Sequence, residues 1–332
     1  MAQCTRYHSS SVDPNELIPP LVAVIGPTGS GKSELAIRVA LEVGGEIVNC
    51  DSVQLYRGFH VGTAKVSTEE RRGVAHHLID VLDAGQVFTA GDYSRRAAAV
   101  LHAIAERHRV PIVVGGTGFY LRALLEGLFP GPPRDRALRE RLQSREARRP
   151  GSLHRILQRL DPKAGARIHP NDKNKLMRAL EVRLVAGRPM SALFEQGRAP
   201  LTGFRPIKLG LDPARELLYR ALDARTLRIF EKGLLNEVRD LLASGVVRTA
   251  KPFESLGYKQ ALAVVEGRMT ETAALESTRL ETRRYAKRQL TWFRKEPGVH
   301  WLRGFGGDAE TQAQALAIIR RELHAGSKSF QM

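Results

Sequence analysis

The sequence predicts an α/β fold: a parallel sheet flanked by helices, with an all-helical subdomain inserted between two of its strands. Short β-rich runs alternate with helical patterns along the chain, and this alternation is typical of a parallel, doubly wound sheet. One gap between consecutive β-rich runs is too long for a single crossover, which indicates the insertion. The five expected strands are residues 21–26, 46–51, 111–116, 207–212 and 299–302.

Proline- and glycine-rich segments mark the domain boundaries. FPGPP (129–133) and GRAPLTGFRP (197–206) bracket a long stretch of helical pattern. Such segments typically separate domains, because they interrupt helices and strands. We therefore expect a flexible N-terminal tail, a core in two pieces, a helical insert and a C-terminal tail. These parts are residues 1–19, 20–130 with 205–303, 131–204 and 304–332.

The motif GPTGSGKS lies directly after the first expected strand and before the amphipathic pattern SELAIRVALEV (33–43). This strand–loop–helix context is the one that a phosphate-binding loop requires, so the core is predicted to be P-loop NTPase-like. Backbone N–H groups and the helix N-terminus can surround an anion, while Lys32 neutralises phosphate and the Ser33 hydroxyl can hold Mg²⁺. The expected diphosphate-binding residues are Gly26, Pro27, Thr28, Gly29, Ser30, Gly31, Lys32 and Ser33.

A phosphate-binding loop does not name a reaction, because kinases, ATPases and GTPases all use one. In many nucleotide hydrolases an acid follows a later buried strand, yet here residues 111–116 end in two glycines and lead to Thr117. The acid is instead Asp51, at the tip of the second expected strand, where ligands of doubly wound sheets converge. We interpret Asp51 as a group that meets an acceptor substrate. The alternative is that Asp51 caps the turn DSVQ, and the two roles are compatible.

The chain is strongly basic, with 52 Lys and Arg against 35 Asp and Glu, a net charge of +17 and a pI near 10.4. This excess predicts a polyanionic partner, with nucleic acid first, although a solvated basic surface is the alternative. Residues 134–149 and 279–295 concentrate the charge. In the second segment Arg284 and Arg288 recur at i, i+4, as do Arg283 and Lys287, which would form basic ridges suited to phosphate contact.

Other features narrow the class of protein. No run approaches the roughly 18 to 20 apolar residues that a membrane span needs, and the N-terminus lacks a signal-peptide pattern. Cys4 and Cys50 offer neither a disulfide framework nor a metal cluster, so we expect a cytoplasmic protein. His76 and His77 are adjacent and have no Cys partner nearby, which favours a packing or turn role over metal binding.

Eight motifs occur in the order seen in bacterial tRNA dimethylallyltransferases, the tRNA isopentenyltransferases, and the chain resembles this family over residues 20–303. The motifs are GPTGSGKS, DSVQLYRG, GTAK, HHLID, GGTGFYLRAL, DPKAGARIHPNDKNKLMRALEV, SLGYKQ and TRRYAKRQLTWFR. The resemblance implies transfer of the dimethylallyl group from dimethylallyl diphosphate to N6 of the adenosine at tRNA position 37, with Mg²⁺. It also implies that the tRNA anticodon stem-loop is the partner, and we expect a monomer.

The resemblance assigns roles to individual residues. The expected catalytic residues are Asp51, Thr117 and Arg225. Asp51 would be the general base on N6, Thr117 would contact substrate near the diphosphate and N6, and Arg225 would grip the diphosphate. With the ridge pair, the expected tRNA-binding residues are Asp51, Ser52, Val53, Gln54, Thr117, Arg139, Asn174, Lys175, Arg178, Arg284 and Arg288. Many bacterial relatives have Gln-Arg-x-x-Arg where this chain begins with Asn174 and Lys175, and Lys cannot make the planar, bidentate contacts of Arg.

Three alternatives remain open at the level of sequence. An adenylate isopentenyltransferase would share the loop and the acid but use a free nucleotide, and the basic insert argues against it. A P-loop kinase or small NTPase would need γ-phosphate chemistry. An RNA-binding module with a vestigial loop would not explain Lys32, Ser33 and Asp51 together. Some relatives carry a C-terminal zinc module, whereas this sequence has no Cys after Cys50.

Overall fold

The computed structural model describes residues 18–129, 131–195 and 197–328. The chain divides into two compact units, residues 1–122 with 202–332, and residues 123–201. Most of the predicted N-terminal tail, 1–19, lies outside the described residues. The second unit corresponds to the predicted insert, but its boundaries differ from the expected 131–204 by a few residues.

A six-stranded parallel sheet forms the centre of the first unit, in the order β3-β2-β4-β1-β5-β6. All five predicted strands are present. The strands are β1 (Pro20–Ile25), β2 (Gly45–Asn49), β3 (His76–His77), β4 (Val110–Gly115), β5 (Arg205–Leu211) and β6 (Val299–Leu302).

The strand that sequence analysis missed is β3. Its two histidines pair in parallel with Ile47 and Val48 of β2 and complete the edge of the sheet. The His77 ring lies 2.7 Å from the Glu46 carboxylate, and the His76 ring lies 2.9 Å from the Val74 carbonyl. The sequence analysis expected a packing or turn role for these histidines, and the structure places them in an edge strand. A strand of two residues is too short to be predicted from a sequence pattern.

Helices cover both faces of the sheet because the crossovers run in opposite directions. The connection from β1 to β2 passes through α1 (Lys32–Val43), and the connection from β3 to β4 passes through α2 (Ala90–Glu106). Since such crossovers are right-handed, α1 and α2 lie on opposite faces. Val22 and Val24 of β1 face α1, while the intervening Ala23 points to the other face.

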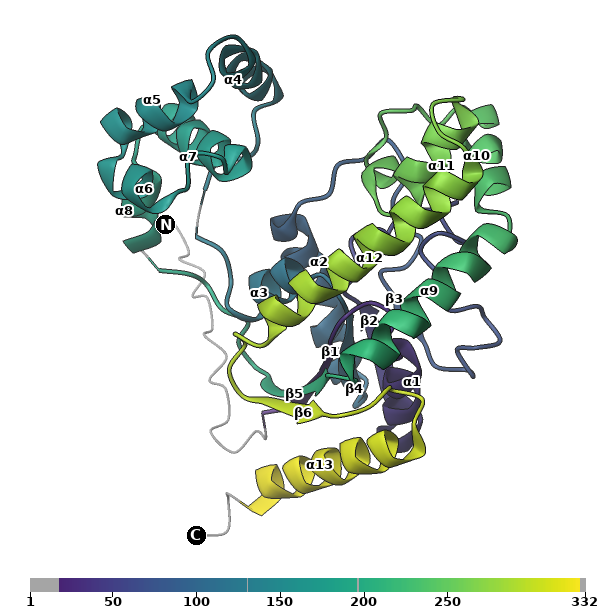
Figure 1. Ribbon diagram of the computed structural model, residues 1–332. Helices are drawn as coiled ribbons and strands as arrows, with labels where there is room; N and C mark the ends of the chain where they lie inside the picture. The colour runs from purple at the N-terminus through teal and green to yellow at the C-terminus, as the bar shows by residue number, and fades with distance from the viewer. Residues whose placement is uncertain (1–17, 130, 196, 329–332) are drawn as a thin grey trace, which may run out of the picture. The chain divides into compact units, whose positions relative to one another are not determined.

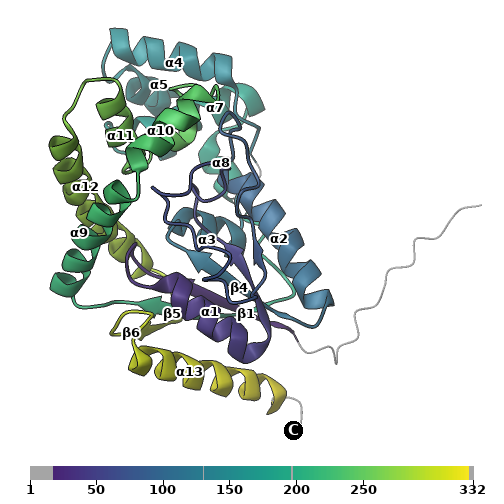
Figure 2. The same cartoon turned by 90° about the vertical axis from the view of Figure 1, so that its right-hand side faces the viewer.

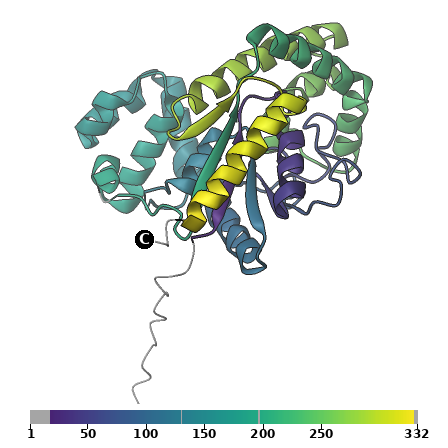
Figure 3. The same cartoon turned by 90° about the horizontal axis from the view of Figure 1, so that it is seen from below.

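The segment predicted as a C-terminal tail, 304–332, is largely helical. Helix α13 (Ala309–Lys328) packs against α1, as Figures 2 and 3 show. Ala315, Leu316 and Ile319 are 0%, 6% and 0% exposed, and they join the main core. The tail prediction is corrected, because a short apolar stripe at helical spacing is sufficient to dock the helix.

The remaining helices of the first unit follow β5. Helices α9 and α12 lie side by side (Figure 1) and share a small apolar cluster of Leu218, Leu222 and Ala286. The guanidinium of Arg283 on α12 pairs with the carboxylate of Asp223 on α9, with Nε 2.9 Å from Oδ1. These helices are α9 (Arg215–Glu231), α10 (Leu234–Ala243), the 3₁₀ helix η1 (Lys251–Glu254), α11 (Tyr258–Val265) and α12 (Glu271–Phe293).

The second unit is helical within its described residues, as predicted, and has its own core. Leu153, Leu157, Leu176 and Leu180 are fully buried in that core. Helix α3 (Gly118–Leu125) leads into this unit from the first. The helices of the unit are α4 (Arg136–Arg148), α5 (Ser152–Leu160), α6 (Pro162–Arg167), α7 (Lys173–Ala186) and α8 (Met190–Glu195).

Candidate active site

A cavity of about 850 Å³ lies in the first unit. The phosphate-binding loop follows β1, Asp51 follows β2, and Gly115 ends β4. Because connections leave β1 and β4 in opposite directions, the crevice between these strands is the topological switch point, where ligands of such sheets bind. The phosphate-binding loop, Asp51 and Arg225 all line the cavity.

The phosphate-binding loop has the backbone conformation of an anion nest. Gly29 and Gly31 have φ angles of 76° and 81°, which residues other than glycine rarely adopt. Gly31 is the N-cap of α1, and no side chain caps this helix. The first N–H groups of α1 have no partner within the helix, so they are available to an anion in the cavity.

Lys32 enters the cavity from the first turn of α1. Its Nζ donates a hydrogen bond to the Pro27 carbonyl at 2.6 Å. Burial and the charge of Arg225 lower the pKa of Lys32, the charge of Asp51 opposes both effects, and the net pKa is about 7. An anionic ligand would therefore restore the full charge of this lysine.

Arg225 on α9 also reaches the cavity, as the resemblance implied. Its Nη2 lies 3.4 Å from the Thr63 carbonyl oxygen. Burial lowers the pKa of Arg225, and the charge of Asp51 raises it. The structure thus brings two cations and one carboxylate, from three separate elements, into one cavity.

Asp51 caps the turn that follows it. Its Oδ1 accepts hydrogen bonds from the N–H groups of Val53 at 2.8 Å and Gln54 at 3.3 Å. Asn49 holds the backbone of Asp51 through its own amide, at 3.1 Å and 3.2 Å. No described residue bonds Oδ2, so the cap leaves one oxygen for a substrate proton, and the two predicted roles are geometrically compatible.

Thr117 contacts the backbone of the turn DSVQ (51–54). Its Oγ1 accepts a hydrogen bond from Ser52 N at 3.1 Å, and its own N–H donates to the Cys50 carbonyl at 3.2 Å. Thr117 is not among the residues that line the cavity, whereas Gln54 is. In this geometry Thr117 supports the turn that carries Asp51.

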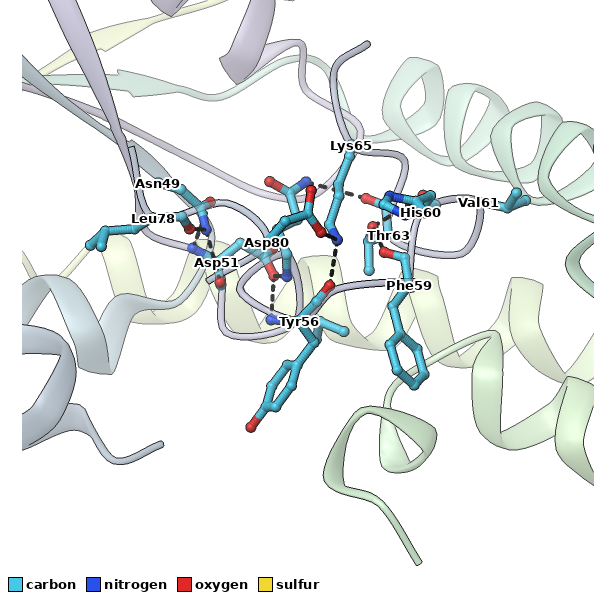
Figure 4. A network of polar contacts seen from close by, with 12 residues as sticks. Asn49, Asp51, Tyr56, Phe59, His60, Val61, Thr63, Lys65, Leu78 and Asp80 are labelled. Atoms are coloured by element: carbon cyan, nitrogen blue, oxygen red, sulfur yellow. Dashed lines mark hydrogen bonds and ion pairs between the residues drawn. The ribbon is translucent and has the colours of Figure 1, made fainter. Parts of the chain in front are cut away.

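The loop of residues 60–66 forms one wall of the cavity and was missed as a functional element by sequence reasoning. Figure 4 shows Lys65 between the Tyr56 carbonyl and the Asp80 carboxylate, with Nζ 2.6 Å and 2.5 Å from their oxygens. Burial lowers the pKa of Lys65, and Asp80 raises it. Lys65 lies in the motif GTAK and Asp80 in the motif HHLID. Both residues could therefore be picked out in the sequence, but the sequence did not show that they form an ion pair.

The same loop is also held by the adjacent helices. Glu237 Oε2 accepts hydrogen bonds from the N–H groups of His60 at 3.0 Å and Val61 at 2.7 Å, while its other oxygen accepts from the Tyr258 hydroxyl. As a result the Thr63 carbonyl is fixed where Arg225 can bond it. Tyr258 belongs to the motif SLGYKQ, and one structural role of this motif is therefore to hold the loop of residues 60–66.

Comparison with known proteins decides the family. The IPP transferase family model matches residues 54–296. The chain is 57% identical over 304 residues to the tRNA dimethylallyltransferase of Solibacter usitatus, covering 92% of this chain and 99% of the relative. It is 54% identical over 303 residues to that of Koribacter versatilis, covering 91% and 98%. The protein belongs to the IPP transferase family.

Solved structures agree with this membership. The tRNA isopentenylpyrophosphate transferase of Bacillus halodurans matches with a TM-score of 0.70 at 34% identity, covering 94% of this chain and 99% of that one. A eukaryotic dimethylallyltransferase acting on tRNA matches with a TM-score of 0.79 at 27% identity, covering 92% and 80%. The predicted P-loop NTPase-like fold and the predicted family are confirmed.

In the second unit, Arg139 and Arg178 bind a buried carboxylate. Both residues were expected to bind tRNA in this member of the IPP transferase family. Arg139 Nε lies 2.9 Å from Glu181 Oε1, and Arg178 Nη1 lies 2.7 Å from Glu181 Oε2. Glu181 is 0% exposed, and the two guanidinium groups are partly exposed. Asn174 and Lys175 are exposed at the start of α7, and the Lys175 ammonium pairs with the Asp172 carboxylate at 2.7 Å.

The basic ridge on α12 is accessible. Arg284 and Arg288 are exposed, and the Arg288 guanidinium lies 5.7 Å from the centre of the Tyr285 ring. Arg283, which the sequence placed in a second ridge, is engaged with Asp223. A different face of α12 carries Tyr285 and Gln289 into the cavity.

Among residues 18–129, 131–195 and 197–328, no group of three His, Cys, Asp or Glu side chains could hold a metal ion. Mg²⁺ usually takes few protein ligands and keeps waters or phosphate oxygens, so Ser33 alone is chemically adequate at this position.

No helix in the described part of the chain is long and apolar enough to cross a membrane.

Proposed function

We propose that this protein transfers the dimethylallyl group of dimethylallyl diphosphate to N6 of the adenosine at tRNA position 37, next to the anticodon, and releases diphosphate. The observation that carries the proposal is the shared cavity, in which the phosphate-binding loop, Lys32 and Arg225 accompany the carboxylate of Asp51. A diphosphate leaving group needs the cations, and an amine acceptor needs the carboxylate.

The phosphate-binding loop acts on the donor. Loss of diphosphate from an allylic carbon is easy only when the charge that develops on the leaving oxygens is neutralised. Here the N–H groups at the start of α1 and the basic side chains of Lys32 and Arg225 face the same cavity. Because these groups are already in place before the reaction, they stabilise the separating diphosphate without rearrangement.

Ser33 is the residue that would hold Mg²⁺. Its hydroxyl is a hard oxygen ligand in the first turn of α1, and it lines the cavity beside Lys32. When bound there, the ion would supply further positive charge to the diphosphate. The donor half of the site therefore needs no dedicated cluster of acidic ligands.

Asp51 acts on the acceptor. The exocyclic amine of adenine is a weak nucleophile and must lose a proton as the new C–N bond forms. Oδ2 of Asp51 takes this proton, while Oδ1 stays bonded to Val53 and Gln54 and keeps the carboxylate oriented. A general base of this kind typically contributes about 10² to 10⁴ in rate.

The basic surfaces would bind the tRNA. The target base must leave its stack to reach a cavity, which is easiest in a single-stranded loop such as the anticodon loop. Arg284 and Arg288 on α12 and the exposed Lys175 on α7 offer contacts to phosphates. We expect a monomer that acts in the cytoplasm.

The proposal is tested by transfer of labelled dimethylallyl diphosphate. We expect label on an unmodified tRNA that carries adenosine at position 37, and none on the same tRNA with guanosine there. Asp51→Asn serves as the matched inactive variant. Label on AMP in place of tRNA would favour an adenylate isopentenyltransferase, and ATP consumption without transfer would favour a kinase or NTPase; either result would contradict the proposal.

A further inference from the structure

Gln289 on α12 joins two loops of the site that are distant in sequence. Its Oε1 accepts a hydrogen bond from the backbone N–H of Thr28 at 2.8 Å, and its Nε2 donates to the carbonyl of Gly116 at 2.8 Å. The residue is 6% exposed, so water does not compete freely for these bonds. One side chain thus bonds both the phosphate-binding loop and the turn after β4.

The fit around this amide is close. A Cβ atom added at Gly116 would lie 2.2 Å from Gln289 Nε2, so only glycine leaves room for it. The polarity is also fixed, because one end must accept from an N–H and the other must donate to a carbonyl. A glutamate carboxylate could serve Thr28 but would face the Gly116 oxygen with a second negative oxygen.

The Thr28 bond ties the backbone of the phosphate-binding loop to a distant helix, and a second bond reaches this loop from another distant segment. On the other side, Gly306 N donates to the Ser30 carbonyl at 2.9 Å. Leu222 of α9 packs against Gly29, where an added Cβ would lie 2.6 Å from its Cδ2. The anion nest is therefore shaped by residues outside the motif itself.

The hydrogen bond from Gln289 to Gly116 connects the side chain to the part of the site that contains Asp51. Thr117 follows Gly116 directly, and its hydroxyl accepts from Ser52 N in the turn that Asp51 caps. Two hydrogen bonds and the peptide units Gly116–Thr117 and Asp51–Ser52 therefore connect Gln289 to Asp51. No other side chain in the described residues bonds both Thr28 and Gly116.

We propose that Gln289 is a positioning residue that holds the diphosphate half and the acceptor half of the site in register. The inference rests on the proposed function for its acceptor half, but its donor half concerns only the shape of the phosphate-binding loop. Loss of the amide leaves a partly buried N–H and a buried carbonyl without partners, and the two loops then relax independently.

The test compares Gln289→Met, Gln289→Glu and the exposed-site control Gln314→Met with the wild type. Inorganic diphosphate binding is measured by calorimetry, and transfer to tRNA by single turnover at saturating substrates. For Gln289→Met we expect about ten- to a hundredfold weaker diphosphate binding and a similar loss in the single-turnover rate, since a partly buried N–H and a buried carbonyl lose their partners. The control should match the wild type in both measurements.

Gln289→Glu provides a readout that general destabilisation would not give. A protonated carboxylic acid can donate to the Gly116 carbonyl, whereas a carboxylate cannot. The ratio of its transfer rate to that of the wild type should therefore rise as the pH falls from 7 to about 5.5. Dividing by the wild-type rate removes the pH dependence that both proteins share.

Several outcomes decide between the possibilities. Wild-type diphosphate affinity and transfer in Gln289→Met would overturn the inference, as would a flat Gln289→Glu ratio across the pH range. If Gln289→Met fails to fold, the Gln289→Glu ratio decides alone. A wild type that does not transfer to tRNA would overturn the proposed function, while the effect of Gln289→Met on diphosphate binding would still test the donor half of the inference.

Discussion

Lys32 and Arg225 face the same cavity, and the charge of Arg225 adds to burial in lowering the pKa of Lys32 to about 7. A free lysine titrates near 10.4, so at neutral pH a substantial fraction of Lys32 is uncharged in the ligand-free protein. A diphosphate between the two side chains would reverse this effect, because the anion favours the charged lysine.

We therefore predict proton uptake when diphosphate binds. Above pH 7 the free lysine is mostly neutral and the bound lysine is charged, so affinity should fall as the pH rises through 7. Calorimetry at pH 8 in two buffers of different ionisation enthalpy measures the uptake. Lys32→Arg stays charged at every pH and should show less uptake than the wild type. Equal uptake in both proteins would show that Lys32 does not titrate on binding.

Lys32→Ala should lose transfer activity through the donor. With the point charge opposite the leaving group removed, the single-turnover rate should fall by about 10² or more, since a preorganised charge is a large part of such catalysis. Binding of the tRNA alone, measured by fluorescence anisotropy, should hold. Wild-type turnover in this variant would remove the phosphate-binding loop from the mechanism.

The substitution Asp51→Asn distinguishes the role of Asp51 as a general base from its role as a cap of the following turn. The amide oxygen can still accept from Val53 and Gln54, but the side chain cannot take a proton, so single-turnover transfer should fall by about 10² to 10⁴ at unchanged melting temperature. Asp51→Ala removes both roles and should also cost about 0.5 to 2 kcal/mol of stability. An Asn variant that transfers at the wild-type rate would mean that N6 loses its proton to another group.

The parts of this site that the sequence predicted are those encoded locally. The phosphate-binding loop and the strand before Asp51 each lie within one short segment, so motif and pattern identify them. Gln289 could not be assigned in this way, because its partner Thr28 lies 261 positions away and only the packing of α12 brings them together. Helix α13 was missed for a related reason: its buried stripe is too short to distinguish docking from a solvated tail.

Arg139 illustrates a different limit. The sequence suggested an RNA contact because the residue is basic and matches a family position, and nothing in the pattern reveals that Glu181, 42 positions away, is buried against it. A guanidinium that satisfies a buried carboxylate is structurally required whatever it does for RNA. The two roles can be separated only by measuring stability and binding on the same variants.

Glu181→Gln should destabilise the second unit. Burial raises the pKa of Glu181, but hydrogen bonds from Arg139 and Arg178 outweigh that effect and the pKa is lowered overall. The stabilisation is therefore present above the ordinary glutamate pKa and is lost as the pH falls through the lowered value. Because breaking a buried pair leaves uncompensated charge, we expect a loss of about 3 kcal/mol or more at pH 7.

Urea unfolding at pH 7 and pH 3 measures this prediction. The difference between the wild type and Glu181→Gln should shrink at the lower pH, where the carboxylate begins to take up a proton. Glu195→Gln, at an exposed carboxylate of the same unit, is the matched control and should change stability little. A Glu181→Gln protein as stable as the control at pH 7 would contradict the clamp.

The last prediction concerns the ridge of Arg284 and Arg288. Both side chains are exposed on α12, on a different face from Gln289, so replacing them with alanine should leave the diphosphate site intact. If each contacts a phosphate, tRNA affinity should fall and the slope of log affinity against log salt should flatten by roughly 0.7 to 0.9 for each lost contact. The control is the double alanine variant of Arg320 and Arg321 on α13, which removes the same charge from another exposed helix. A fall in affinity with an unchanged slope would indicate a distant charge effect, whereas flattening in the ridge variant alone would place RNA phosphates directly on this face of α12.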